Sequence, residues 1–503
     1  MSGFAVVTGQ SASSDVESMM DRMRHRGPDH AGRRQVGPFA MAQNYLGADI
    51  GGPLENTPLP LAIGDVTLCY DGQIANWPER ATQFGVSGGP LRDERLILKM
   101  YEKDGADLFK HLDDAIFAFA ISDGNRLLVA RDLLGMKTLF YARKGDTLMF
   151  ASELKALAGL AEEVHEFPPG HFMDEKGALT PFAELPTEAP PTRTDDVDTM
   201  CRDIREIVQR KIDTLVDFSR PTAGLLSGGM DSSVINLLAT QKLRKEQGDD
   251  ARLRTYAIGV GESSDIHNAR IMAKHIGSDH REMLIEPEQL VEVLPQVVYH
   301  LENFDPSLVR SAASNYLISR QAHRDGYEVV LSGEGGDEVF CGYTYLKEFP
   351  SDKLVEKQVE CLAYLHHNAA HRLDRMNACH SVRVVAPLVS GELLDYAMTV
   401  PPQYKQHPEE GGKVEKWIFR KAYEELLPEA ITWRLKQEFS QGSGSADFLP
   451  NYFEKQVTDG DYEDLKRRHP LIRSKEEAYY FKIFIDNFGE GTAVESVGQW
   501  VSL

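Results

Sequence analysis

The sequence has few cysteines and no long apolar run. Five cysteines are scattered along the 503 residues without a CxxC pair: Cys69, Cys201, Cys341, Cys361 and Cys379. This spacing indicates neither a zinc site nor a disulfide framework, and it predicts buried thiols in a reducing compartment. No segment approaches the roughly 20 consecutive apolar residues of a membrane span, and the first residues lack the basic and apolar regions of a signal peptide. We therefore expect a cytoplasmic protein without a membrane partner.

Positive charge is also scarce. Lys and Arg total 55 against 77 Asp and Glu, which gives a formal net charge of −22 at pH 7. Nucleic acids and anionic membrane surfaces bind clustered basic residues, so this balance argues against a nucleic-acid partner. The hydrophobic fraction of 42% is that of a folded globular chain. Because one hydrophobic core stops growing at roughly 250–300 residues, we expect at least two domains.

The first third of the chain has the pattern of a β-rich domain. Short apolar segments such as Val66–Tyr70 and Ile116–Ile121 alternate with turns rich in Gly, Asp and Asn. Strands at this spacing, with few long helical periods, predict an α+β domain of stacked sheets over residues 1–184. The stretch that follows is rich in Pro and Thr and has no periodicity, which indicates a linker over residues 185–196.

Beyond this linker, short apolar segments alternate with helical patterns. We expect strands at Ala223–Leu226, Thr255–Gly259 and Val329–Leu331. Their alternation with helices predicts βαβ units and a parallel sheet in a second, α/β domain over residues 197–503, which is mostly helical beyond about Leu354. In such sheets ligands bind beyond the carboxyl ends of the strands, so the turns at those ends are the candidate sites.

The turn Ser227–Ser233, with the sequence Ser-Gly-Gly-Met-Asp-Ser-Ser, joins an expected strand to an expected helix. Two adjacent glycines allow positive φ and close backbone approach, so its N–H groups can converge on an anion at a helix N-terminus. Asp231 can hold Mg²⁺ against phosphates. The turn matches neither GxxxxGK[ST] nor GxGxxG. It therefore predicts a phosphate-binding loop of a different kind from these two.

A second turn, Ser332–Glu338, contains three glycines and three carboxylates in seven residues. Carboxylates this close repel one another unless a cation lies between them or one of them is protonated. The turn therefore predicts a magnesium site or a proton-transfer role. Since both turns follow expected strands of the same sheet, each strengthens the interpretation of the other.

A third motif, Trp433–Ser440, follows these two turns and reads Trp-Arg-Leu-Lys-Gln-Glu-Phe-Ser. The order and approximate spacing of the three motifs resemble those of the asparagine synthetase family, which includes the related β-lactam and carbapenam synthetases. The first domain resembles the glutamine-hydrolysing domain of that family through Arg24–Asp29, Arg131–Gly135 and Ala151–Lys155. The resemblance covers nearly the whole chain, to about residue 485. The sequence is identified as a member of this family.

The resemblance implies a two-domain fold, with stacked antiparallel sheets like those of Ntn hydrolases followed by a parallel-sheet domain like that of ATP pyrophosphatases. It also implies a ligase that uses ATP and Mg²⁺, transfers AMP to a substrate carboxylate, releases pyrophosphate and lets an amine attack the acyl-adenylate. The implied nucleotide-binding residues are Leu226, Ser227, Gly228, Gly229, Asp231 and Ser232 for the phosphates, and Ile258, Ser332 and Gly333 for the nucleoside.

The resemblance also implies roles for charged residues. Asp231 and Asp337 would ligate Mg²⁺. Arg310 and Lys436 would neutralise the charge that develops on pyrophosphate and on the tetrahedral intermediate, and Glu334 would accept the proton of the attacking amine. Such groups suit a reaction in which adenylation turns a carboxylate oxygen into a good leaving group and preorganised cations stabilise the transition state.

The glutaminase-like part departs from the family pattern. The family uses an N-terminal cysteine as its nucleophile, whereas this chain has Ser2, a far weaker nucleophile near neutral pH. Tyr45 stands where the family has the arginine that pairs with the carboxylate of glutamine. The family's Asn-Gly-Glu is replaced by Asp71-Gly-Gln73, and only Asp93 remains of the polar set. We therefore expect an inactive glutaminase-like domain kept for structure.

Several functions stay open at this point. The favoured one is a ligase that joins ammonia or a small amine to a small carboxylic acid. Glu334 resembles the residue of the ammonia-using members of the family, whereas β-lactam formers carry a tyrosine at this place. The alternatives are an intramolecular lactam-forming cyclase, a glutamine-dependent asparagine synthetase that uses Ser2, and a catalytically silent binding protein. Segment Arg383–Ser390 departs from the family's Glu-Ala-Arg-Val-Pro-Phe-Leu-Asp, so the identity of the acid is open. A homodimer is one option for the assembly.

Overall fold

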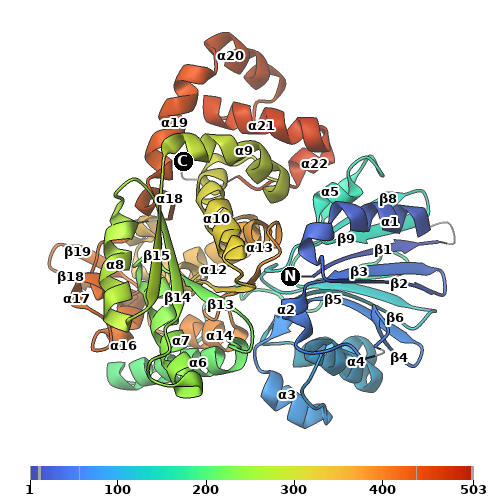
Figure 1. Ribbon diagram of the computed structural model, residues 1–503, viewed down its shortest axis with the longest axis horizontal. Coiled ribbons are helices and arrows are strands. Elements are labelled where there is room, and N and C mark those ends of the chain that lie inside the picture. Colours follow the sequence, from blue (N-terminus) through green and yellow to red (C-terminus); the bar gives the residue numbers. More distant parts are fainter. Residues whose placement is uncertain (1, 10–12, 56, 438, 500–503) are drawn as a thin grey trace.

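The computed structural model describes residues 2–9, 13–55, 57–437 and 439–499. Figure 1 shows an N-terminal domain, blue to cyan, beside a C-terminal domain, green to red. The first is built on antiparallel sheets and the second on a parallel sheet, which confirms the fold class expected from the sequence. Between Pro181 and Val197 the chain forms no helix or strand.

The N-terminal domain contains two antiparallel sheets of six strands each. The first sheet runs, in spatial order, through β10 (Val164–Glu166), β8 (Phe140–Lys144), β9 (Thr147–Ala151), β1 (Gly3–Thr8), β3 (Phe39–Tyr45) and β2 (His30–Val36). The second runs through β12 (Leu179–Pro181), β11 (His171–Asp174), β7 (Leu127–Arg131), β6 (Ala115–Ser122), β5 (Val66–Ile74) and β4 (Leu61–Ile63). The helical segments are α1 (Ser13–Arg22), η1 (Arg24–Arg26), α2 (Gly47–Ile50), α3 (Trp77–Phe84), α4 (Arg92–Asp104), η2 (Gly105–His111) and α5 (Leu154–Leu157).

The first strand shows why its sequence is apolar at every position. Successive side chains of a strand point to opposite faces of the sheet. Phe4 and Val6 belong to the apolar cluster that includes Cys69 of β5, and this cluster fills the space between the two sheets. Ala5 and Val7 belong to a different cluster, which includes residues of α1. Because both faces of β1 are covered, the strand lacks the polar alternation of a surface strand.

The C-terminal domain is built on a five-stranded parallel sheet in the order β15–β14–β13–β16–β17. Its strands are β13 (Thr222–Leu225), β14 (Arg254–Val260), β15 (Asp279–Ile285), β16 (Val329–Leu331) and β17 (Arg383–Val385). The chain moves outward from β13 to β15 and then returns to the other side of β13 with β16. Adjacent strands β13 and β16 therefore form a topological switch point, where the loops at their carboxyl ends diverge and leave a crevice.

Helices surround this sheet. Those before residue 354 are α6 (Val197–Leu215), α7 (Met230–Gln247), α8 (Ser264–Ile276), α9 (Pro287–Leu301), α10 (Pro306–Arg324), α11 (Gly336–Phe340), η3 (Thr344–Glu348) and η4 (Ser351–Lys353). Later ones are α12 (Leu354–Tyr364), η5 (Leu365–His367), α13 (Ala369–Ala378), α14 (Gly391–Thr399), α15 (Pro402–Lys405), α16 (Trp417–Tyr423), α17 (Glu429–Thr432), α18 (Phe439–Gly442), α19 (Ser445–Gln456), α20 (Asp459–Arg468), α21 (Lys475–Phe488) and α22 (Thr492–Glu495). The expected helical character of this last part is confirmed, although it also contains β17 and a hairpin of β18 (Gln406–Glu409) and β19 (Gly412–Glu415).

The end of the described chain returns to the N-terminal domain. The backbone N–H of Val164 in the edge strand β10 donates to Oγ1 of Thr492 in α22, over 2.8 Å. This contact joins residues 328 positions apart. A helix thus lies against the outer strand of the first sheet, a common way to protect an edge strand from pairing with other chains. Within the described ranges, no helix has both the length and the apolar character that crossing a bilayer requires.

Candidate active site

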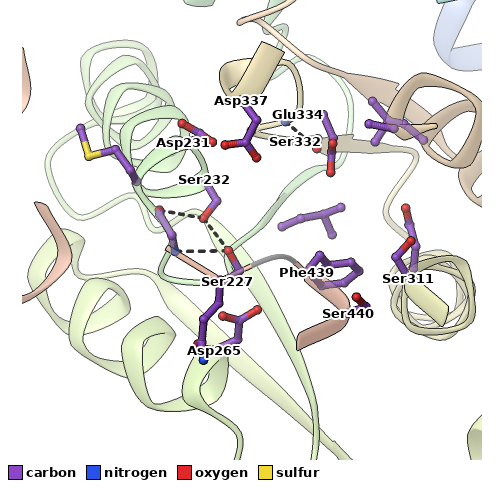
Figure 2. Close-up of a pocket in the computed structure, with 18 of the residues that line it drawn as sticks. Ser227, Asp231, Ser232, Asp265, Ser311, Ser332, Glu334, Asp337, Phe439 and Ser440 are labelled. Carbon is purple, nitrogen blue, oxygen red and sulfur yellow. Dashed lines mark hydrogen bonds between the residues drawn. The ribbon is translucent and has the colours of Figure 1, made fainter. Parts of the chain in front are cut away.

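A pocket, hereafter the switch-point pocket, opens at the carboxyl ends of β13 and β16 (Figure 2). Its wall includes the loops that follow these two strands, part of β14, one face of α10, the start of α13, and segments between residues 416 and 440. Eleven of the residues expected from the sequence line it: Leu226, Ser227, Gly229, Asp231, Ser232, Ile258, Ser332, Gly333, Glu334, Asp337 and Lys436. Two glycine-rich turns that lie about a hundred residues apart therefore face one cavity.

The loop after β13 is held by hydroxyl groups and by glycine. The Oγ atoms of Ser227 and Ser232 are 3.1 Å apart, and the N–H of Gly229 donates to Ser227 Oγ over 3.2 Å. Gly228 does not line the pocket, but its φ of +68° lies in the left-handed region, and a Cβ there would lie 2.3 Å from backbone carbon of Asn268. Glycine is required at this position because a side chain would be both strained and blocked.

The two glycine-rich turns come into backbone contact. A Cβ on Gly333, in the loop after β16, would lie 2.5 Å from the backbone nitrogen of Ser232 at the start of α7. A Cβ on Gly336 would lie 2.5 Å from Oδ1 of Asp231. Glycine therefore lets the second turn approach the N-terminus of α7, where N–H groups and the helix dipole favour an anion. Larger residues would push the turns apart and fill the space beside the Asp231 carboxylate.

Two carboxylates and two ammonium groups meet at the base of the pocket. Figure 2 shows Asp231 and Asp337 side by side. Lys416 forms ion pairs with both carboxylates and lies 2.5 Å from Asp337 Oδ1. Lys436 lies 2.6 Å from Asp337 Oδ2. Opposite charges thus alternate around the site, which reduces the repulsion that two adjacent carboxylates would otherwise feel.

The pKa values of these groups follow from burial and charge. Burial raises the pKa of Asp231, and the nearby Asp337 raises it further, although Lys416 acts in the opposite direction. Burial would also raise the pKa of Asp337, but Lys416 and Lys436 more than offset this, so its pKa lies below the ordinary value. Burial would lower the pKa of Lys436, but the two aspartates raise it above the ordinary value. Lys436 and Asp337 are therefore both charged at neutral pH.

The opposite wall is contributed mainly by α10 and α13. Ser307, Ser311, Asn315 and Ile318 of α10 line the pocket, at the spacing that places side chains on one helix face. At the start of α13, Ala369, Arg372 and Leu373 also line it. Hydroxyl, amide and apolar groups on this wall can contact an organic substrate that lies beside the expected phosphate-binding loop, Ser227–Ser233.

Arg372 connects this wall to the second glycine-rich turn. Its guanidinium forms an ion pair with Glu334, donates to Asn315 Oδ1 over 3.2 Å, and lies 5.3 Å from the ring centroid of Phe439. The backbone N–H of Glu334 donates to Ser332 Oγ over 3.3 Å. The carboxylate of Glu334 is thus fixed at the pocket wall, where it could accept a proton from a bound group.

The structure places Arg310 elsewhere. Its side chain does not line the pocket and instead pairs with Glu476 of α21, with a closest contact of 2.5 Å. Consecutive residues of an α-helix are turned by about 100°, so Arg310 lies beside the face that carries Ser311, on the side that reaches Glu476. Arg310 therefore lies outside the pocket in this structure, and its expected role toward pyrophosphate stays a prediction.

Some pocket residues have no clear signal in the sequence. Lys416 follows the β18–β19 hairpin, and Arg372 lies on a helix with no motif around it. Arg434 precedes Lys436 by two residues, donates to the carbonyl of Gly228 over 2.9 Å, and pairs with Asp265 over 3.2 Å. Burial raises the pKa of Asp265 to about 6, although Arg434 opposes the shift. Only the tertiary fold brings these residues to the two turns.

In the N-terminal domain, the residues expected to mark a lost glutamine site are engaged by other protein groups. Ser2 Oγ donates to Asp49 Oδ2 over 3.0 Å, and Asp93 Oδ2 accepts from the N–H of Ile74 over 3.2 Å. Tyr45 is fully buried in an apolar cluster. Its position therefore offers no cationic group that could pair with an amino-acid carboxylate.

Arg383 reaches this region from the C-terminal domain. Its guanidinium donates to the Ala48 carbonyl over 3.0 Å and to Gln73 Oε1 over 3.3 Å, and it lies 3.5 Å from Asp49 Oδ1. In the sequence, Arg383 is the position at which the family's acid has become a base. The structure shows that this base contacts the N-terminal domain rather than the switch-point pocket.

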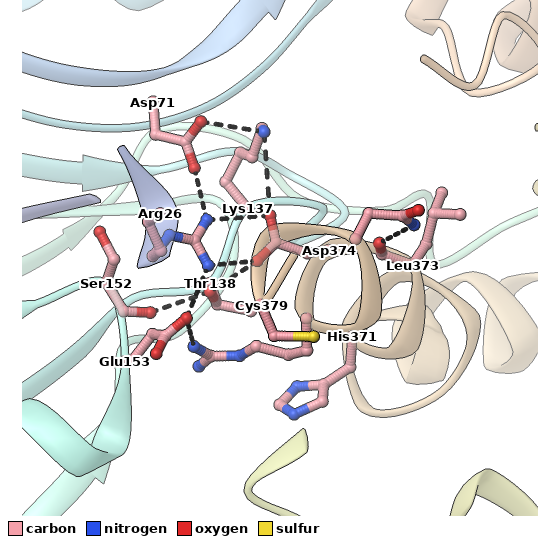
Figure 3. Close-up of polar contacts among 12 residues, drawn as sticks. Arg26, Asp71, Lys137, Thr138, Ser152, Glu153, His371, Leu373, Asp374 and Cys379 are labelled. Carbon is pink, nitrogen blue, oxygen red and sulfur yellow. Dashed lines mark hydrogen bonds and ion pairs between the residues drawn. The ribbon is translucent and has the colours of Figure 1, made fainter. Parts of the chain in front are cut away.

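A buried group of charges, hereafter the interdomain charge cluster, joins the two domains (Figure 3). Arg26 lies at its centre and is fully buried. It contacts Asp374 at 2.6 Å, Asp71 at 2.9 Å and Glu153 at 3.0 Å. Lys137 lies 3.0 Å from Asp71 Oδ1. Burial would lower the pKa of Arg26, but these three carboxylates raise it well above the ordinary value.

The cluster continues through Glu153. Arg375 contacts Glu153 at 2.7 Å and Glu302 at 2.8 Å, and Lys155 lies 2.9 Å from Glu302 and also pairs with Glu153. The cluster as a whole combines the cations Arg26, Lys137, Lys155 and Arg375 with the carboxylates Asp71, Glu153, Glu302 and Asp374. Because the formal charges balance, the cluster can stay dry at the domain boundary.

Comparisons with known proteins agree with this architecture. The model of the asparagine synthase family matches residues 203–360 and 351–490, and that of the glutamine amidotransferase domain matches residues 1–172. The chain is 30% identical to asparagine synthetase [glutamine-hydrolyzing] 1 of Saccharomyces cerevisiae, over 95% of this chain and 91% of the relative. It is 31% identical to asparagine synthetase B [glutamine-hydrolyzing] of Escherichia coli K12, over 94% of this chain and 88% of the relative.

A third relative, asparagine synthetase [glutamine-hydrolyzing] of Gallus gallus, is 31% identical over 83% of this chain and 80% of its own length. Among solved structures, a glutamine phosphoribosylpyrophosphate amidotransferase of B. subtilis matches at a TM-score of 0.33 and 14% identity, over 56% of this chain and 81% of that chain, a likeness too weak to interpret. The sequence matches extend over both domains and include the loops that build the switch-point pocket. The chain therefore belongs to the asparagine synthase family.

Proposed function

We propose that the protein is an ATP-dependent ligase that adenylates a small carboxylic acid and joins the acyl group to ammonia or a small amine. The observation that carries this proposal is the meeting of three components in the switch-point pocket: the loop Ser227–Ser232, the pair Asp231 and Asp337 with its lysines, and Glu334 of the second glycine-rich turn, which Arg372 of the opposite wall contacts. The loop supplies N–H and hydroxyl donors at a helix N-terminus for a polyphosphate. Lys436 can stabilise the charge that develops on pyrophosphate as it leaves.

The acidic pair also suits a magnesium ion. Asp231 Oδ1 is buried and accepts no hydrogen bond from any residue that the structure describes. Gly336 leaves open the space next to this oxygen. Carboxylate oxygens are the donors that Mg²⁺ prefers, and Asp231 and Asp337 would hold it. When bound, the ion would neutralise the phosphates of ATP.

The acyl half of the reaction is assigned to the wall formed by α10 and α13. Ser311 and Asn315 offer a hydroxyl and an amide toward the cavity, while Ile318 and Leu373 supply apolar contact. Glu334, oriented by Arg372, would accept the proton that the amine loses as it attacks the acyl carbon. The AMP leaving group departs with its electron pair on the phosphate side of the pocket.

The nitrogen source is proposed to be free ammonia or an amine. The family resemblance implies a cysteine nucleophile and a carboxylate-binding arginine in the N-terminal domain, but this chain has Ser2 and buried Tyr45. Gln73 and Asp49 are engaged by Arg383. A zwitterionic glutamine would lack a counter-charge at Tyr45.

The test combines two assays on the full-length protein. ATP–pyrophosphate exchange is measured with a panel of carboxylic acids, beginning with aspartate because the relatives are named asparagine synthetases. Exchange without added amine identifies the acid, and the absence of exchange with every acid would contradict the adenylation step. Product formation is then compared with ammonium and with glutamine as nitrogen source, and the product mass separates an open amide from a lactam.

A second candidate is glutamine-dependent amide synthesis with Ser2 as the nucleophile. It is favoured by the amidotransferase model that matches residues 1–172 and by the words glutamine-hydrolyzing in the names of the relatives. In the assay above, release of glutamate in equal amount to the amide would select this candidate. That result would overturn the proposed nitrogen source and leave the proposed adenylation intact.

A further inference from the structure

Outside the switch-point pocket, one group of side chains has the composition of a metal site. Glu166 at the end of β10 faces His366 and His367 of η5, so the group lies where the two domains touch. One ligand atom from each residue lies within 4.8 Å of those of the other two. All three side chains are half-buried. Nothing in the proposed ligase reaction uses them.

Two of the three pairwise distances lie near those of a zinc site, and the shorter of the two is that of a hydrogen bond. His366 Nδ1 lies 2.8 Å from Glu166 Oε1, and His367 Nε2 lies 3.4 Å from Glu166 Oε2. In tetrahedral zinc with bonds of about 2.0–2.1 Å, neighbouring ligand atoms are roughly 3.3 Å apart. Small side-chain movements would therefore place all three atoms on one ion. Two imidazoles and a carboxylate with a fourth position for water form a donor set that suits Zn²⁺ rather than Mg²⁺.

The surrounding backbone holds the two imidazoles in place. A Cβ on Gly135, whose φ is +60°, would lie 2.7 Å from Cβ of His366. A Cβ on Gly498 would lie 2.6 Å from Cγ of His367. Two separate segments thus approach the histidines closely because they carry glycine there. The imidazoles are positioned before any ion binds, which reduces the ordering cost of binding.

Arg131 forms an ion pair with the Glu166 carboxylate. It contacts Glu166 Oε1 at 2.7 Å and also donates to the carbonyls of Lys137, Phe167 and Gly135 over 2.6, 2.7 and 2.9 Å. These backbone contacts hold the guanidinium independently of Glu166. A ligating carboxylate commonly receives such a hydrogen bond from a neighbouring group, which orients it toward the metal. Glu166 Oε2 remains directed toward His367.

We propose that Glu166, His366 and His367 bind one Zn²⁺ ion that links the two domains. The site has consequences for the switch-point pocket, because η5 is followed directly by Asn368 and Ala369, and both line that pocket. The ion holds this turn against β10 and thereby gives the N-terminal domain a role that needs no glutamine chemistry. The carboxylate and the imidazoles come from segments 200 residues apart, so the site exists only in the folded chain.

The experiment measures zinc binding by the full-length protein after removal of metals with a chelator. Isothermal titration with ZnCl₂ is expected to show one site in the wild type. His367→Ala and Glu166→Gln are each expected to weaken it by at least about 100-fold, since even changes next to a metal ligand cost 10–100-fold. Co²⁺ should give the visible absorption of a four-coordinate site in the wild type and not in these variants. Zinc should also raise the thermal midpoint of the wild type and not that of His367→Ala or Glu166→Gln.

His165→Ala is the matched control, because His165 precedes Glu166 in the same strand and pairs with Glu163, at 4.0 Å, rather than with the proposed zinc ligands. This variant should bind zinc as the wild type does. Absence of zinc binding by the wild type would overturn the proposal. Equal zinc binding by the wild type, His367→Ala and Glu166→Gln would also overturn it, because the ion would then bind elsewhere.

Discussion

The two domains use buried charge in opposite ways. In the N-terminal domain and at its boundary, carboxylates such as Asp71 and Glu153 are satisfied by Arg26 and other protein cations, and the residues around Ser2 are engaged by Arg383. In the switch-point pocket, charged groups line a cavity, and Asp231 Oδ1 accepts no hydrogen bond from the described residues. The first domain thus places its charged groups mainly in ion pairs with other protein groups, although Asp93 Oδ1 is also without a hydrogen bond from the described residues, while the second places them around a cavity.

Breaking the interdomain charge cluster is expected to have the largest effect. Arg26→Leu leaves Asp71, Glu153 and Asp374 without their central cation, and loss of one partner from a buried ionic group costs about 3–5 kcal/mol. Urea unfolding should show this loss in the free energy of unfolding. Arg33→Leu is the control, because Arg33 is an exposed residue of β2 that pairs only with exposed Glu17 among the described contacts. A loss below 1 kcal/mol for Arg26→Leu would show that the domains do not depend on this cluster.

Lys436 is the matching test for a charged residue that lines the switch-point pocket. Lys436→Ala should lower turnover by about 10²–10³-fold, because a preorganised cation would no longer stabilise the leaving pyrophosphate. Its thermal midpoint should stay close to that of the wild type. Lys455→Ala, at an exposed position of α19, should leave turnover unchanged. Near-wild-type kinetics of Lys436→Ala would remove this residue from the mechanism.

The buried carboxyl group of Glu338 should make the stability of the protein depend on pH. Burial raises its pKa from 4.5 to about 7, and the neighbouring Asp337 adds to the shift. An acid whose pKa is raised by folding contributes stability while it is protonated, and this stability is lost as the pH rises from about 4.5 to 7. The glutamine of Glu338→Gln cannot ionise. The free energy of unfolding of this variant should therefore equal that of the wild type near pH 4.5 and exceed it by up to about 3 kcal/mol near pH 8.

Urea unfolding at the two pH values gives this difference directly. Tyr343, which donates to Glu338 Oε1 over 2.5 Å, can make the same hydrogen bond to the amide oxygen of glutamine. A variant that is less stable than the wild type at the higher pH would show that the Glu338 carboxylate is stabilised when it is charged.

The smallest effect is expected at Ser2. Ser2→Ala removes one hydrogen bond to Asp49, far from the switch-point pocket. Distant sites act nearly independently, so ammonium-dependent synthesis should stay within about twofold of the wild type. The rate is measured with saturating ATP and acid. A large loss would show that the contact between Ser2 and Asp49 supports the switch-point pocket and would weaken the contrast between the domains.

Most of the fold was predictable because its signals are local. Segments Val66–Tyr70 and Ile116–Ile121 lie within β5 and β6, and the strand expected at Val329–Leu331 is β16. Their apolar and β-branched residues bounded by turn residues are the pattern of buried strands. The β18–β19 hairpin gave no such signal, because its sequence is polar and contains Pro408. Its pairing depends on neighbouring elements rather than on strand propensity.

The site was predictable to the extent that it consists of loops at strand ends. The turns that contain Asp231 and Asp337 carry glycines and acids in fixed order, so their chemistry is visible in the sequence. Lys416 and Arg372 were missed because they come from other parts of the chain and are brought to the pocket only by tertiary packing. Arg310 was assigned to the pocket, but its phase on α10 points it toward Glu476.

The contact between β10 and α22 can form only late in the synthesis of the chain. Val164 is made 328 residues before Thr492, its partner across the domain boundary. At a synthesis rate of about 5–20 residues per second, this corresponds to roughly 15–65 s on the ribosome. During that interval the outer strand of the first sheet lacks its cover. The edge strand β10 therefore lacks its contact with α22, and is open to pairing with other chains there, until the last helix arrives.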